Sequence, residues 1–165
     1  MKVIVIGASG TIGSKVAEKL KENHHEVIEV GSQSGDYQLD ITSPEQIEKM
    51  YKDIDNIDAV VSATGGATFK ALSEISLEEN NVAIQSKLLG QINLVLIGQH
   101  YLNENGSFTL KSGIMMDDPI KLGSSAAMAN GGIAGFVTSA AVELNHGLRI
   151  NNVSPNVVEE ALDKY

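Results

Sequence analysis

Runs of apolar residues with two different spacings follow one another along the chain. Residues 3–6 form an unbroken β-branched run, which is typical of a strand buried on both faces. Ile12, Val16 and Leu20 then recur every four residues, which is the spacing of one helix face. A second strand is predicted at 26–30, so the first thirty residues form a strand–helix–strand unit with parallel strands.

The same alternation continues along the rest of the chain. Further strands are predicted at 37–41, 59–63, 108–110 and 148–153, and long helices at 81–102 and 124–144. Ser43, Pro44 and Gln46 combine an N-cap, a first helical residue and the end of a capping box, so another helix begins there. Ser76 and Glu79 have the spacing of a second capping box.

Glycines with a spacing of three residues fill the turn between the first strand and the first helix. Gly7, Gly10 and Gly13 allow a ligand to approach the backbone, and the helix start offers free N–H groups and the positive end of its dipole. The turn therefore predicts a site for the pyrophosphate of a nucleotide. The alternative is a tight turn that binds nothing. The other turn residues assigned to this site are Ser9, Thr11 and Ile12.

The end of the second strand bears on which nucleotide is bound. An acidic residue there would accept a hydrogen bond from the ribose 2′-OH of NAD, but Gly31, Ser32 and Ser34 supply no carboxylate. The two hydroxyl groups favour the 2′-phosphate of NADP. NAD stays possible, because no arginine or lysine is present to pair that phosphate.

The fourth strand ends in small residues, Ala63, Thr64 and Gly65. Ligands of open parallel sheets bind at the carboxyl ends of the strands. This segment should therefore lie on the same rim as the glycine turn and leave room for a flat cofactor.

Composition limits the remaining choices. The chain has 165 residues, 42% of them hydrophobic, which fits one domain spanning 1–165. A net charge of −9 argues against nucleic acid and anionic membranes as partners. With 0 Cys there are no disulfides, thiolate nucleophiles or cysteine–zinc sites, and no metal site is predicted. The first residues do not resemble a signal peptide, so a cytoplasmic location is expected.

The chain resembles the short-chain dehydrogenase/reductase family over essentially its whole length. The segments that carry the resemblance are the turn 7–13, Asp40 with Ile41, the segment 63–65, Ser112, and the stretches 140–144 and 149–155. The resemblance implies a Rossmann-like, doubly wound parallel sheet in three α/β/α layers with strand order 3-2-1-4-5-6. It also implies an NAD(P) site and hydride transfer between the cofactor and a small carbonyl or alcohol.

The family's catalytic residues are only partly present. Ser112 stands where a serine polarises the carbonyl, whereas Ala126 and Asn130 occupy the positions of the family's tyrosine and lysine. Asn130 could still bond a ribose. Gln85 stands where a preceding helix often carries an asparagine, and Pro155 ends the resemblance, since family members usually continue into a substrate loop and a further strand.

Three hypotheses follow. The first is an NADP-dependent reductase with a displaced proton donor, for which Lys111 and Lys121 are the nearest cations in sequence. The second is a non-catalytic NADP-binding protein that acts as a sensor or subunit, and the third is a fold relative that binds no nucleotide. The apolar and small residues of the helices at 81–102 and 124–144 predict a homodimer or homotetramer.

Overall fold

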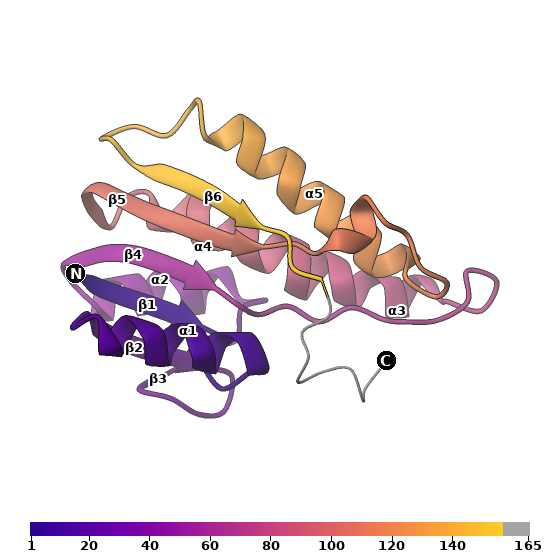
Figure 1. Cartoon of the computed structure of the whole chain (residues 1–165), viewed down its shortest axis with the longest axis horizontal. Coiled ribbons are helices and arrows are strands. Elements are labelled where there is room, and N and C mark those ends of the chain that lie inside the picture. Colours follow the sequence, from indigo (N-terminus) through magenta and orange to yellow (C-terminus); the bar gives the residue numbers. More distant parts are fainter. Residues whose placement is uncertain (157–165) are drawn as a thin grey trace.

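The computed structural model describes residues 1–156, which form a six-stranded parallel sheet (Figure 1). The strands are β1 (Lys2–Ile6), β2 (Glu26–Gly31), β3 (Tyr37–Gln38), β4 (Ile57–Ser62), β5 (Leu102–Lys111) and β6 (Arg149–Val153). Their order is β3-β2-β1-β4-β5-β6. The doubly wound topology predicted from the sequence is therefore confirmed.

Helices cover both faces of this sheet. They are α1 (Thr11–Glu22), α2 (Pro44–Asp53), α3 (Leu77–Val82), the π-helix η1 (Ala83–Leu89), α4 (Gly90–Gly98), the 3-10 turn η2 (Ile114–Met116) and α5 (Ser124–Ala140). Val16 and Leu20 of α1 pack on Val3 and Val5 on one face. Residues of α2, α4 and α5 pack on the other face with the larger core cluster, which gives the three layers.

The predicted helix starts are confirmed with one difference. Ser43 caps α2 by accepting a hydrogen bond from the Gln46 N–H at 3.3 Å. The Gln46 side chain does not complete a capping box, because it accepts instead from the Asp40 N–H at 3.0 Å. Ser76 and Glu79 form the full capping box of α3. The Ser76 N–H and then Lys70 lower the pKa of Glu79 to about 2.

The bounds predicted for the two long helices are wrong. The first covers 77–98 and changes from α- to π-helical turns on the way, and the second ends at Ala140. The first ends at Gly98, where the turn is pressed against the core: a Cβ there would lie 2.6 Å from the Tyr51 ring and 3.0 Å from Phe108. The chain then enters β5 at Leu102, six residues earlier than predicted.

The third strand is shorter than predicted. It covers Tyr37–Gln38 rather than 37–41, although Leu39 and Ile41 are buried as the alternation requires. Asp40 breaks the pairing because its carboxylate accepts hydrogen bonds from both the N–H and the hydroxyl of Thr42, which closes a turn.

Candidate functional site

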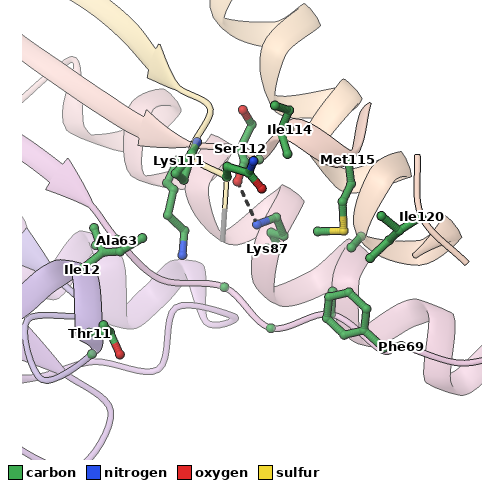
Figure 2. A pocket seen from close by; sticks show the side chains of 18 of the residues that line it. Thr11, Ile12, Ala63, Phe69, Lys87, Lys111, Ser112, Ile114, Met115 and Ile120 are labelled. Carbon is green, nitrogen blue, oxygen red and sulfur yellow. Dashed lines mark hydrogen bonds between the residues drawn. The ribbon is translucent and has the colours of Figure 1, made fainter. Parts of the chain in front are cut away.

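A cavity of about 530 Å³ lies at the carboxyl ends of β1, β4 and β5. Figure 2 shows Thr11 and Ile12 at one end and Phe69, Met115 and Ile120 at the other. Seven of the predicted site residues line it: Gly10, Thr11, Ile12, Ala63, Gly65, Ser112 and Pro155. The others are not part of this lining: Gly7, Ser9, Gly13, Ser32, Ser34, Asp40, Ile41, Thr64 and Asn130.

The three glycines of the turn differ in backbone conformation and in packing. Gly7 has φ +80°, and a Cβ there would lie 2.9 Å from the Ala63 carbonyl oxygen. A Cβ on Gly13 would lie 2.0 Å from the Gly7 oxygen, so the first turn of α1 rests directly on this loop. Gly10 is exposed and has φ −80°. Among the described residues no side chain caps α1, so its first N–H groups face the rim with the positive dipole end.

The loop after β4 rests on the π-helix. Gly65 has φ +107°, and a Cβ there would lie 2.7 Å from Cα of Lys87. The N–H of the next residue, Gly66, donates to the Ser86 hydroxyl at 3.2 Å. This contact fixes η1 at the edge of the cavity, because only glycine allows so close an approach.

Lys87 is the cavity residue that the sequence analysis missed. Its side chain comes from η1, and the residue is only 7% exposed. Its ammonium donates to the Ser112 carbonyl oxygen at 3.2 Å (Figure 2). Burial, and then the charge of Lys111, lower the pKa of Lys87 from 10.5 to about 8. A signal was available, because Lys87 is the one charged residue between Val82 and Gly98.

Lys111 brings a second cation to the same cavity. It is the last residue of β5, and its backbone bonds to the Gln91 side chain through both N–H and C=O, at 2.9 Å each. Figure 2 shows its ammonium on the side of the cavity nearer to Ile12 and Ala63. Burial lowers the pKa of Lys111 as well. Of the two cations proposed from the sequence, Lys111 lines the cavity, and Lys121 does not belong to the lining.

Ser112 and Ala126 line the cavity, whereas Asn130 is buried outside its lining. The Ser112 hydroxyl and both side-chain atoms of Asn130 are buried and have no hydrogen-bond partner among the described residues. The Asn130 amide nitrogen would lie 2.9 Å from a Cβ on Gly113, the residue after Ser112. Ala126 lines the cavity and offers only a methyl group. The role of Ser112 in polarising a substrate stays a prediction.

Gln85 does not reach the cavity. It is exposed, and its amide donates to the Asn81 side chain at 3.4 Å. The residue of this helix that lines the cavity is instead Lys87, two residues later. Gln85 was assigned by the family resemblance, and the wider turns of this π-helix were not predicted from the sequence.

The end of β2 is polar and exposed. Ser32 and Ser34 are exposed, as the proposed contact with a 2′-phosphate requires. Gly31 tolerates no side chain without a shift, because a Cβ would lie 2.7 Å from the Ser34 carbonyl oxygen. Two hydrogen bonds from Thr42 lower the pKa of the nearby Asp40 carboxyl group.

The described part of the chain contains neither a metal-binding cluster nor a membrane-spanning helix. No three His, Asp or Glu side chains gather there in a way that could hold a metal ion. In residues 1–156 no helix combines the length and apolar character needed to cross a bilayer.

Comparisons with known proteins agree with this geometry. A sequence model of the short-chain dehydrogenases, described as enoyl-(acyl carrier protein) reductase, matches residues 7–164. The chain is similar to the protein lin1944 from Listeria innocua, with 58% identity, a TM-score of 0.96, and coverage of 99% of this chain and 82% of that one. A comparison with curated proteins found no match.

Two further solved structures are more distant. A small-chain dehydrogenase is 25% identical with a TM-score of 0.86, over 94% of this chain and 82% of that one. A small-chain dehydrogenase in complex with NADPH is also 25% identical, with a TM-score of 0.87 over 94% of this chain and 69% of that one. The aldohexose dehydrogenase of Thermoplasma acidophilum, 23% identical with a TM-score of 0.89, shares the fold. The chain therefore belongs to the short-chain dehydrogenase/reductase family of oxidoreductases.

Proposed function

We propose that this protein is an NADP-dependent oxidoreductase that acts on a small carbonyl or alcohol. The observation that carries the proposal is the cavity, which reaches from the N-terminus of α1 to the end of β5 and Ser112. That location is where open α/β sheets bind their ligands. Its volume of about 530 Å³ is in the range of small-molecule sites.

The residues at the rim fit a dinucleotide. The N–H groups of Thr11 and Ile12 would hold the pyrophosphate, because they lie at an uncapped helix start beside the exposed Gly10, whose own N–H donates to the Gly7 carbonyl oxygen at 3.0 Å. Ser32 and Ser34 would lie beside the adenosine ribose and favour NADP over NAD. A related small-chain dehydrogenase was solved with NADPH. When bound, the nicotinamide supplies or accepts the hydride.

Other predicted contacts would complete the cofactor site. Ala63 and Gly65 form a flat wall next to the glycine turn, and Asn130 offers a buried amide without a partner in the described chain. Contacts are also proposed for Gly7, Ser9, Gly13, Asp40, Ile41, Thr64 and Pro155.

The position at which the family carries its proton donor holds an alanine in this chain. Ala126 has no ionisable group, and general acid–base catalysis contributes roughly 10²–10⁴ in rate. We therefore expect slow turnover of common ketones and aldehydes. Binding of NADP without turnover, as in a sensor or a subunit, is the second candidate function, and the same methyl group at Ala126 favours it.

Calorimetric titration with NADPH and NADH tests the proposal. Gly10→Val should abolish NADPH binding while the protein stays folded, because the branched side chain blocks the phosphates. At φ −80° the new Cβ needs only a shift of a few tenths of an ångström from the Gly7 carbonyl oxygen, which lies 3.3 Å away. Ser14→Val, at an exposed position one turn along α1, is the matched control and should bind normally. Unchanged affinity in Gly10→Val would place the nucleotide elsewhere.

Turnover with a carbonyl panel separates the two candidate functions. Ala126→Tyr supplies a phenol at the cavity wall and should raise the rate of reduction, whereas Ala126→Phe adds similar bulk without a proton and should not. Fast turnover by the natural sequence would show that another group already donates the proton.

We also propose a homodimer or homotetramer formed through α4 and α5. Leu89 and Leu96 on the α4 side and Met128 on α5 are partly exposed, at 36%, 48% and 40%. Apolar side chains that lie on neighbouring helices and stay uncovered fit a second copy of the same surface.

A further inference from the structure

Two lysines in the cavity lack the acidic partner that other lysines of this chain have. Ion pairs with Asp or Glu are formed by Lys2, Lys15, Lys19, Lys21, Lys49, Lys52 and Lys70. Within the described residues, Lys87 and Lys111 have no carboxylate within ion-pair distance, although the chain carries a net charge of −9.

This arrangement is unfavourable for folding. Lys87 is 7% exposed, and the two lysines lie close enough for Lys111 to lower the pKa of Lys87. Burying two like charges without a counter-charge costs free energy, and apolar side chains would fill the same space without that cost. Such clusters in a cavity indicate a ligand rather than a need of the fold.

The two ammonium groups are free to bind a ligand. Lys87 uses one of its three N–H donors on the Ser112 carbonyl, which leaves two. The hydrogen bonds of Lys111 within the described chain involve only its backbone. Figure 2 shows both nitrogens directed into the cavity.

The other residues that line the cavity indicate which charge and which substituent the ligand carries. Asp118, at the exposed rim, contributes one negative charge to the lining without pairing with either lysine, so the lining carries a net charge of +1 and a ligand with a single negative charge balances it. A carboxylate brings one charge, whereas a phosphate ester brings nearly two. Phe69, Met115 and Ile120 form an apolar wall at the far end, as Figure 2 shows, which fits an aliphatic or aromatic substituent.

We propose that Lys87 and Lys111 bind the carboxylate of the substrate, and that the substrate is a 2-oxo acid, or the matching 2-hydroxy acid, with an apolar side chain. This inference rests on the proposed function for the carbonyl chemistry. The recognition of the carboxylate depends only on this chain's own residues.

Calorimetric titration of the protein without cofactor, using 4-methyl-2-oxopentanoate, tests the binding step. The acid should bind, and its methyl ester, which lacks the charge, should not. Lys87→Met and Lys111→Met should each weaken binding by about tenfold or more, because a charged hydrogen bond is lost. Lys121→Met removes an exposed lysine next to the wall residue Ile120 and should bind like the natural protein.

The same variants distinguish the carboxylate from the cofactor phosphates. Lys87→Met, whose ammonium lies farther from Ile12 and Ala63 than that of Lys111, should keep the NADPH affinity of the natural protein within about twofold. If Lys87→Met loses NADPH affinity while the acid fails to bind, the lysines serve the cofactor and the inference is overturned. If Lys87→Met and Lys111→Met bind the acid as tightly as the natural protein does, the inference is also overturned. If the acid binds as expected but NADPH does not, the proposed function fails and the carboxylate site stands.

Discussion

Replacing Lys87 with methionine should make the protein more stable, although it removes a residue of the proposed site. Burial and the neighbouring Lys111 hold the pKa of Lys87 at about 8, against 10.5 for an ordinary lysine. Because the folded state binds the proton less tightly than the unfolded state, the charged lysine opposes folding. This penalty is complete below pH 8, decreases between pH 8 and 10.5, and is absent above 10.5.

The size of the effect follows from the shift. Each pKa unit corresponds to about 1.4 kcal/mol, so the lowered pKa costs about 3 kcal/mol of folding free energy at neutral pH. The hydrogen bond to the Ser112 carbonyl oxygen offsets about 1 kcal/mol of this cost. Methionine has a similar length and packs with the apolar lining. Lys87→Met should therefore gain about 2 kcal/mol near neutral pH.

Urea unfolding over a range of pH measures this gain. The difference between Lys87→Met and the natural protein should be largest at neutral pH and should fall by about 3 kcal/mol as the pH rises past 10.5, where the lost hydrogen bond leaves the variant about 1 kcal/mol less stable. Lys121→Met, at an exposed position, serves as the control and should show no such trend. A variant that is less stable at neutral pH, or a difference that does not depend on pH, would refute the reasoning.

Three other predictions concern the cofactor, the core and the assembly. Ser32→Asp should shift the preference from NADPH towards NADH in titrations, because a carboxylate repels a 2′-phosphate; a natural preference for NADH would contradict the assignment. Gly98→Ala should cost about 1–3 kcal/mol in urea unfolding, since the new methyl group meets the Tyr51 ring, and an unchanged midpoint would count against that packing. Leu96→Asp should convert an oligomer to a monomer in light scattering, and a natural protein that is already monomeric would refute the proposed α4–α5 interface.

The sequence predicted the sheet because its signals are local. The β-branched run at 3–6, the stripe of Ile12, Val16 and Leu20, and the cap at Ser43 each depend on neighbours within a few residues. Burial of Val3 and Val5 and the observed strand order agree with them. The placement of the glycine turn at the cavity was predictable for the same reason, since the turn follows a strand and begins a helix.

The rest of the site depends on contacts between distant segments. Lys87 reaches the cavity because η1 has π-helical turns, and a periodicity of 3.6 residues cannot predict that phase. Gly98, at the end of α4, packs against Tyr51, which lies on another helix. The Gln46 side chain accepts a hydrogen bond from the Asp40 N–H rather than from the N-cap N–H, because β3 ends early and brings the Asp40 N–H within reach.

The π-helical stretch 83–89 also limits how this chain can change its length during evolution. Losing one residue there would let the segment return to α-helical turns and rotate everything on one side of it by about 100°. A loss at Leu88 or Leu89 would turn Lys87 away from the cavity or Gly90 away from Ile41, whereas a loss between Ala83 and Ser86 would turn both away from their contacts or reorient α3. Single-residue deletions in this stretch should therefore be selected against even when every remaining side chain is kept. Deletions of the same size in the exposed segment 72–74 should persist among its relatives.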